Sequence, residues 1–310
     1  MRYCALSRFK GAWLGSVLGE ALANHQYKSD RIKIIQYQPP QWLSPRNTIA
    51  EALIKNKGLS AESILNIDYN QLTNSGKSDR AALLLLPLII FCADNIELFK
   101  DIVTHDNLYL LESAEAIEDV LIWGYAISLA LKEKLGAEAL DASSLIEQVL
   151  TGVGVNKTSL IKKLEIVDKA WRCGSSFNEL SKELSGFGDR SQTAIALSFY
   201  CFASTPEDFA LAVKRAANTG NVALTTAALT GALSGAYNSL TGIPLYWNIF
   251  GNKNQDYREV MTTAKELFDT WSGVYAPQNQ NISDDSVFSA VASPLIIQTR
   301  TSLKIISQTE

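Results

Sequence analysis

The chain has few of the residues from which proteins build disulfide frameworks, zinc sites and histidine-based catalytic centres. Its 310 residues include four cysteines and two histidines. The cysteines form no C-x-x-C pair and have no histidine beside them; they are Cys4, Cys92, Cys173 and Cys201. This pattern favours free thiols in a reducing compartment. The first ten residues also lack the features of a secretory signal, so we expect a cytoplasmic protein.

The chain also lacks an excess of positive charge. Its formal net charge is -4 and its pI is about 5.4. An acidic chain without a basic stripe has no general attraction for nucleic acid or for an anionic membrane, so neither is an expected partner. The composition, 47% hydrophobic and 19% charged, is typical of globular proteins.

Long uninterrupted hydrophobic runs are missing as well. Residues 81–93 are strongly apolar, but the segment is too short to span a bilayer and contains Pro87. Residues 222–242 are long enough, yet they include four threonines, two serines and Asn238. We therefore interpret both segments as buried helices of a globular core.

Apolar residues recur at spacings of three and four along most of the chain, which indicates helices. The predicted fold class is all-α, and Ser7 is expected to cap the first helix. Further helices are expected at residues 49–55, 61–67, 78–94, 96–103, 110–135, 142–152, 159–172, 206–217, 224–237 and 256–271. No linker divides the chain, so residues 1–310 are predicted to form one domain. A small β-pair is expected between residues 32–37 and the tail, 295–306.

Local signals predict how several helices begin and pack. Thr48 and Glu51 form the S/T-x-x-E pattern of a capping box. The segment Thr205-Pro206-Glu207-Asp208 combines a capping hydroxyl, a proline at the first helical position and acids that complement the helix dipole. Residues 224–237 are rich in Ala, Thr, Ser and Gly. Because small side chains let helices approach closely, this segment is predicted to be a central helix that others cross.

The chain contains the passages RFKGAWLGSVLGEALA at residues 8–23, AALTGALSGAYNSLTGIPLYW at residues 227–247 and VTHD at residues 103–106. These three passages resemble the ADP-ribosylglycohydrolase family, in the manner of the dinitrogenase-reductase-activating glycohydrolases. Residues 8–23, RFKGAWLGSVLGEALA, are similar to the family's opening pattern R-x-x-G-x-x-x-G-x-x-x-G-D-A-x-G, with Glu20 at the aspartate position. Residues 227–247, AALTGALSGAYNSLTGIPLYW, resemble the pattern A-A-I-A-G-A-L-A-G-A-Y-x-G-x-x-x-I-P-x-x-W almost residue for residue. Residues 103–106, VTHD, are similar to a short T-H segment of the family.

The resemblance implies an all-α fold with a central cleft for ADP-ribose and two magnesium ions. In the family, acidic residues of a T-D-D-T motif at a helix start and of a G-G-D-T-D-T motif before the small-residue helix hold these ions. Magnesium prefers hard oxygen ligands, chiefly carboxylates. Two such ions can orient the ribose and activate a water for hydrolysis of an N- or O-glycosidic bond.

The acidic positions of both motifs are replaced in this chain. Counting back from the small-residue helix, the second motif falls on residues 220–225; the first falls on residues 45–48, at the predicted helix start. The degenerate metal positions are Arg46, Asn47, Val222 and Leu224. Apolar side chains offer no donor atom, and an arginine repels a cation. We therefore expect no bound magnesium and no other cofactor.

The leading hypothesis is a non-hydrolytic relative that keeps the fold and the cleft. The cleft residues carried over by the resemblance are Asn47, Thr48, Gly220, Asn221 and Thr225. Such a protein would bind an ADP-ribose-like small molecule or a protein partner. A purely structural subunit, whose former cleft is filled by Val222 and Leu224, remains a further hypothesis.

The alternative is an active hydrolase with a rearranged acid–base site. Weak candidates for its catalytic residues are Glu20, His105 and Asp106. Glu20 could act with either aspartate of Ser283-Asp284-Asp285-Ser286, a segment that mimics the T-D-D-T pattern. That segment follows the small-residue helix, however, and helix capping explains it without a metal. His105 has no recognisable serine or cysteine nucleophile, so the catalytic residues stay open.

Overall fold

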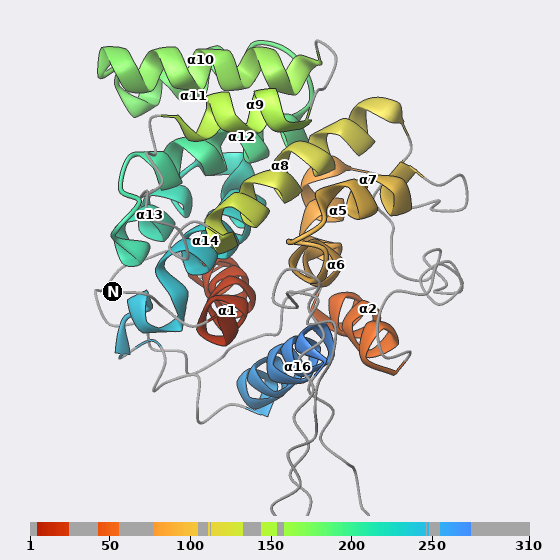
Figure 1. Ribbon diagram of the computed structural model, residues 1–310. Helices are drawn as coiled ribbons and strands as arrows, with labels where there is room; N and C mark the ends of the chain where they lie inside the picture. The colour runs from red at the N-terminus through yellow and green to blue at the C-terminus, as the bar shows by residue number, and fades with distance from the viewer. Residues whose placement is uncertain are drawn as a thin grey trace, which may run out of the picture.

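The computed structural model describes residues 5–24, 43–55, 77–104, 111, 113–132, 144–153, 158–245, 247 and 255–273. These residues form helices and their adjoining turns, and none of them lies in a β-strand, which confirms the predicted all-α fold (Figure 1). The helices are α1 (Ala5–Asn24), α2 (Leu43–Lys55), α5 (Ser78–Leu84), α6 (Leu86–Phe91), α7 (Ile96–Thr104), α8 (Ala114–Lys132), α9 (Leu145–Val153), α10 (Ser159–Cys173), α11 (Phe177–Ser185), α12 (Arg190–Ala203), α13 (Phe209–Ala216), η3 (Gly220–Val222), α14 (Ala223–Gly242) and α16 (Gln255–Ser272). Several predictions concern residues outside the described ones: the β-pair, the helix at 61–67, His105, Asp106 and residues 283–286.

Helices α1 and α14 lie antiparallel and pack against each other along their length, as the small residues predict. Along α1, Gly11 meets Gly235, Gly15 meets Gly231 and Gly19 meets Ala227 of α14. A Cβ atom added to Gly19 would lie 1.9 Å from the Ala227 carbonyl oxygen, so the two backbones touch. The five glycines of these contacts are required because a Cβ on any of them would collide with the facing backbone.

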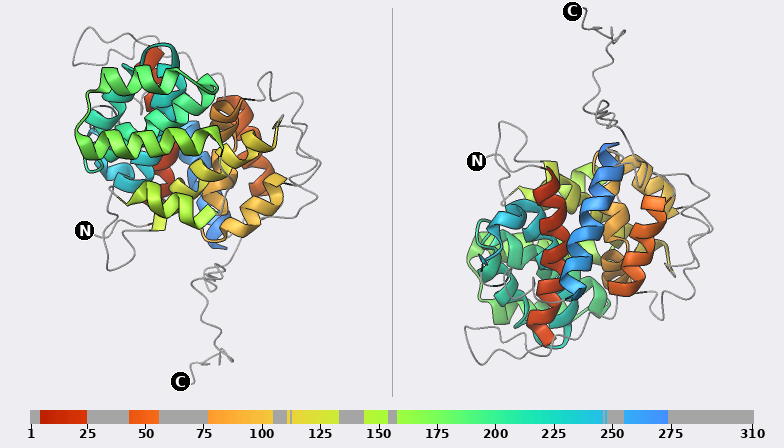
Figure 2. Two further views of the ribbon diagram at one scale, coloured as in Figure 1. Left: turned by 90° about the horizontal axis from the view of Figure 1, so that it is seen from above. Right: turned by 90° about the horizontal axis from the view of Figure 1, so that it is seen from below.

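The remaining helices pack around this pair on opposite sides. α16 lies beside α1, and α2 lies beyond α16, as the right-hand view of Figure 2 shows. α12 and α13 pack on α14, and α5 contacts α8, α12 and α14. α10, together with α9 and α11, covers α12 at the far side from α16. This arrangement brings the starts of α5, α12 and α14 together.

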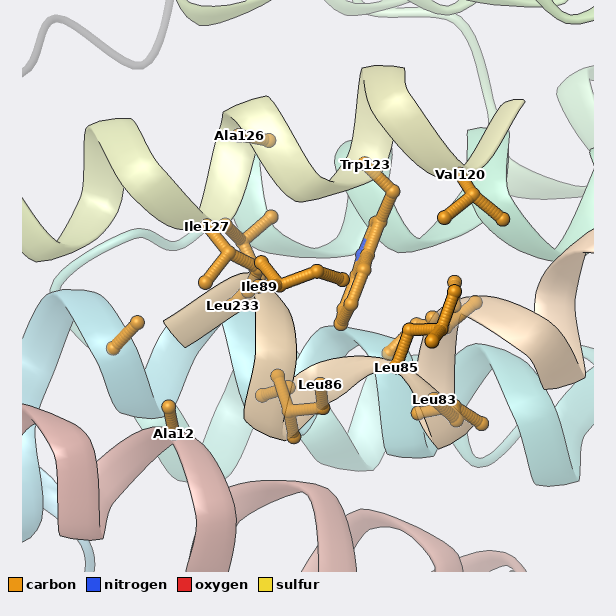
Figure 3. Close-up of a cluster of buried hydrophobic side chains, with 14 of the residues drawn as sticks. Ala12, Leu83, Leu85, Leu86, Ile89, Val120, Trp123, Ala126, Ile127 and Leu233 are labelled. Atoms are coloured by element: carbon orange, nitrogen blue, oxygen red, sulfur yellow. The ribbon is translucent and has the colours of Figure 1, made fainter. Parts of the chain in front are cut away.

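The main hydrophobic core lies between α14 and the helices α5, α6 and α8. Trp123 of α8 is fully buried, and Figure 3 shows its ring reaching toward Leu85 and Ile89. Burial of each such side chain contributes roughly 1.5–3 kcal/mol to stability. Among the described residues, no helix has both the length and the apolar character needed to cross a bilayer.

Helix α2 begins earlier than the sequence predicts. It starts at Leu43, so Thr48 lies inside the helix, and the predicted capping box of Thr48 and Glu51 is wrong. The cause is packing: Arg46, Ile49 and Leu53 are spaced by three and four residues and are all buried on one face. That face makes the first turn of α2 part of the core.

Two other helix starts also differ from the prediction. Pro87 splits the segment expected at 78–94 into α5 and α6, because proline fits the first turn of a helix and not its interior. α13 begins at Phe209, where Asp208 Oδ1 accepts a hydrogen bond from the Leu211 N–H at 2.9 Å, so the start predicted at Thr205 is wrong.

Helices α11 and α12 were not predicted from the sequence. Each begins with a complete capping box, formed by Ser176 with Glu179 and by Asp189 with Gln192. Nearly every residue of α12 is buried, including Ser191, Gln192 and Thr193 in its first turn. A helix buried on all sides lacks the polar face that makes an amphipathic pattern visible.

Candidate functional site

The starts of α5 and α14 meet at a buried contact between Asp79 and Thr225. The Thr225 side chain lies beside the Asp79 carboxyl group, and the Arg80 backbone N–H donates to Asp79 Oδ1 at 2.9 Å. Burial raises the pKa of Asp79 above its usual value, although both neighbours act in the opposite direction. The helix start that contacts Thr225 is therefore that of α5, and not the segment around Asn47.

Asp119 of α8 lies next to this contact. Asp119 is 1% exposed, and the side chains of Ser78 and Gln192 lie beside its carboxyl group. Burial raises the pKa of Asp119 to about 7, and the neighbouring charges of Glu115 and Glu118 act in the same direction. Protonated and ionised forms therefore coexist near neutral pH. Asp119 Oδ1 has no hydrogen-bond partner among the described residues.

These side chains lie around the start of α5, and we call them together the buried acid cluster. Ser78 Oγ donates to Ser191 Oγ at 3.1 Å and so links α5 to α12. The members of the cluster are Ser78, Asp79, Asp119, Ser191, Gln192 and Thr225. Two carboxyl groups with raised pKa values can hold and exchange protons, which is acid–base chemistry. Within the described residues, no three Asp, Glu, His or Cys side chains are grouped as a metal site.

The degenerate positions of the second motif lie directly before Thr225. Val222 and Leu224 are half-buried and pack against the main hydrophobic core. Val222 ends the turn η3, and its carbonyl oxygen accepts a weak hydrogen bond from the Thr225 hydroxyl at 3.4 Å. The side chains at these two positions therefore present hydrocarbon at the start of α14.

The degenerate positions of the first motif are engaged with other helices. Arg46 is fully buried; its Nη1 donates to Ser16 Oγ of α1 at 2.9 Å, and its Cζ lies 5.5 Å from the centroid of the Trp13 ring. Asn47 Nδ2 donates to Glu259 Oε1 of α16 at 2.7 Å. Arginine stays charged in proteins, so a permanent positive charge is fixed among α1, α2 and α16.

The other predicted residues of this region lie on separate surfaces. Thr48 is exposed on α2. Glu20 is buried in α1, one helical turn after Ser16. The contacts of Asn47 are thus with α16, while those of Thr225 are with α5. The structure brings Arg46 toward α1 and Asn47 toward α16, and it records no contact between Asn47 and Thr225.

A polar pocket opens beside η3. Its volume is about 400 Å³, and its lining comes from α11, α12 and the turn before α14. The lining residues are Ser181, Ser185, Gly188, Arg190, Thr193, Leu197, Thr219, Gly220, Asn221 and Val222. The predicted cleft residues Gly220 and Asn221 thus line a pocket of the size that small-molecule ligands occupy. Asn47, Thr48 and Thr225 are not part of this lining.

Sequence reasoning missed Asp79, Asp119 and Arg190. Asp79 had a local signal, because Ser78 and Asp79 directly precede the apolar run 81–93. Asp119 adjoins Glu118 on a helix, and the sequence alone does not say which acid faces inward. Arg190 could not be placed because α12 itself was not recognised.

Comparison with known proteins agrees with this architecture. The model of the family described as ADP-ribosylglycohydrolase matches residues 41–277. A solved structure described as an ADP-ribosylglycohydrolase-related protein complex is similar with a TM-score of 0.58 at 17% sequence identity, over 86% of this chain and 99% of that chain. At this identity, the likeness concerns the fold alone. No curated protein matches the chain.

Proposed function

The chain belongs to the ADP-ribosylglycohydrolase family, and on that premise we propose that it binds an ADP-ribose-like ligand without hydrolysing it through paired magnesium ions. The observation that carries the proposal is the chemistry of the four motif positions. Val222 and Leu224 are apolar and pack against the core, whereas Arg46 and Asn47 are engaged with Ser16 and Glu259. These side chains do not fit a dinuclear magnesium centre.

Electrostatics supports this reading. Magnesium is held by carboxylates and other hard oxygen ligands. The ion gives up its tightly bound water molecules only when such ligands take their place. A hydrocarbon side chain offers no lone pair, and a buried guanidinium adds repulsion that the low dielectric of the interior strengthens. The site that the family uses for hydrolysis therefore lacks its electrostatic basis here.

The pocket beside η3 supports ligand binding. Val222 and Leu224 cover part of the surface before α14, yet a pocket of about 400 Å³ remains open next to them. Its hydroxyl, amide and guanidinium groups suit a ligand rich in ribose and phosphate oxygens. This open volume favours binding over the purely structural role, in which side chains would fill the cleft.

Calorimetry of the full chain with ADP-ribose, in Mg²⁺ and in EDTA, tests the proposal. We expect the same affinity in both buffers and no release of ADP-ribose from an ADP-ribosylated peptide. Asn221→Ala should weaken binding, while Asn218→Ala, an exposed asparagine outside the pocket, should not. Binding or hydrolysis that requires Mg²⁺ would overturn the proposal.

A metal-free hydrolase is the second candidate, and the buried acid cluster favours it. Asp119 has a pKa of about 7, which suits a general acid or base, and Asp79 at the start of α5 is a second buried carboxyl group whose pKa burial raises. In this version Asp119 and Asp79 replace the pairing of Glu20 with residue 284 or 285. Hydrolysis that persists in EDTA, depends on pH near 7 and is lost in Asp119→Asn but not in Glu118→Gln would establish it.

A further inference from the structure

The pocket beside η3 has a one-sided charge distribution. Among the described residues that line it, Arg190 is the charged side chain, and no carboxylate belongs to the lining. Arg190 is exposed at the rim, and its guanidinium forms no hydrogen bond or ion pair with another described residue. An arginine at the rim of a polar pocket is available to an anionic ligand.

A second positive charge stands behind the pocket wall. Lys163 of α10 is fully buried, and its Nζ donates to the carbonyl oxygens of Leu184 and Phe187 and to Thr193 Oγ1. Three acceptors around Nζ fit an ammonium group. Thr193 lines the pocket, as does Gly188, where an added Cβ would lie 3.0 Å from Lys163 Cε. The ammonium group is thus one layer of atoms from the pocket.

The nearest carboxylate in sequence is engaged elsewhere. Asp189 caps α12: Oδ1 accepts from the Arg190 backbone N–H, and Oδ2 accepts from Ser191 Oγ at 3.1 Å. Its negative charge therefore serves the helix start, and it also reaches Lys163, where burial lowers the pKa of the ammonium group and Asp189 acts in the opposite direction. The pocket keeps the positive charge of Arg190 at its rim.

Neutral hydrogen-bonding groups complete the pocket opposite Arg190. Ser181 and Ser185 contribute hydroxyl groups from α11, and Asn221 contributes an amide. The turn from Thr219 (φ -81°, ψ 13°) to Gly220 (φ +73°) has the right-handed then left-handed order of an anion-binding turn, and the Thr219 N–H within it donates to the Ala216 carbonyl oxygen at 3.2 Å. Such turns bind anions.

We propose that this pocket is a phosphate-binding site in which Arg190 makes the charged contact to the phosphate or diphosphate group of the ligand. The inference deepens the proposed function and rests on it for the rest of the ligand, while the phosphate contact stands on the pocket alone. The planar guanidinium can donate two parallel hydrogen bonds to phosphate oxygens, a geometry that a lysine lacks.

The test is calorimetry of the full chain with inorganic pyrophosphate, ADP-ribose and adenosine. Arg190→Gln should weaken binding of pyrophosphate and of ADP-ribose by about tenfold or more, since a hydrogen bond to a charged group is worth at least that factor. It should leave binding of adenosine unchanged. Arg190→Lys should restore part of the loss, and Lys182→Gln, the same charge change on α11 outside the pocket, should have no effect.

The outcomes separate the two proposals. If ADP-ribose binds wild type and Arg190→Gln equally, the phosphate site is refuted while the proposed function stands. If pyrophosphate binds in an Arg190-dependent way and ADP-ribose does not bind, the phosphate site stands and the proposed function fails. If wild type binds neither, both fail. Because Arg190 is exposed, circular dichroism should show that each variant keeps the wild-type helix content.

Discussion

Gly15 of α1 and Gly231 of α14 touch backbone to backbone. A Cβ on Gly15 would lie 2.1 Å from the Gly231 carbonyl oxygen, and a Cβ on Gly231 would lie 2.0 Å from the Gly15 carbonyl oxygen. Neither distance is possible for real atoms, so an alanine at either position must push the helices apart. The spacing of small residues on both helices exists to permit this contact.

Gly15→Ala is therefore expected to destabilise the protein by roughly 3 kcal/mol or more, because overpacked backbone cannot relax as a side chain does. The matched control is Gly174→Ala: Gly174 also needs glycine, for its φ of +64°, but a Cβ there meets no atom within 4 Å. That control should cost about 1 kcal/mol. Urea denaturation of both variants decides the matter; equal losses would refute the packing argument.

Ser239 carries backbone strain at the kink in α14. Its φ of 62° and ψ of 179° belong to a region that only glycine adopts readily, and the resembling family pattern has glycine at this position. Ser239→Gly should stabilise the protein by about 1 kcal/mol, even though the hydrogen bond between Ser239 Oγ and Thr241 Oγ1 is lost. Ser239→Ala keeps the strain and loses the same bond, so it should destabilise. A melting temperature lower in the glycine variant than in the alanine variant would contradict this.

The sequence predicts a helix most clearly when its apolar and polar residues fall on opposite sides or when small residues mark a close helix contact. The small residues of α14 predicted a central helix that other helices approach closely, because that signal is local and steric. α12 escaped prediction because its Ser191, Gln192 and Thr193 are buried together with its apolar residues. Burial on all sides removes the amphipathic period, and only the tertiary structure reveals such a helix.

The candidate site was predictable only where it follows a continuous motif. Gly220 and Asn221 were located by counting back from the small-residue helix, and they do line the pocket. Arg46 was expected in the cleft because of its place in a motif; in the structure it contacts Ser16 and Trp13. Contacts between residues as distant in sequence as Asp79 and Thr225 carry no local signal, so sequence reasoning could not find them.

Asp119 should make the protein less stable as pH rises. Its folded-state pKa of about 7 lies above the usual value of 3.8, so the folded protein binds the proton more tightly than the unfolded chain. Stability is therefore highest below pH 4 as far as this group is concerned, and it is lost between about pH 4 and pH 7. The amide side chain of the Asp119→Asn variant cannot ionise. The free energy of unfolding of this variant, relative to that of wild type, should therefore rise by roughly 2 kcal/mol between pH 5 and pH 8. Denaturation at both pH values, with Asp101→Asn on the exposed face of α7 as baseline, measures this gain; a constant difference would refute it.

Lys163 should be a larger determinant of stability than any surface lysine of the same helix. Its ammonium group is the shared hydrogen-bond donor for the carbonyl oxygens of Leu184 and Phe187, at the end of α11, and it lies 4.4 Å from the Phe187 ring centroid. Lys163→Met keeps the length of the side chain but leaves these buried acceptors without their donor, so we expect a loss of roughly 3 kcal/mol. Lys162→Met removes the same charge from the exposed face of α10 and should change stability by less than about 0.5 kcal/mol.

The two variants share composition and net charge, so the difference in their denaturation midpoints isolates the buried hydrogen bonds. Equal midpoints would mean that water satisfies the carbonyl groups of Leu184 and Phe187, and that the packing of α10 on α11 does not depend on Lys163.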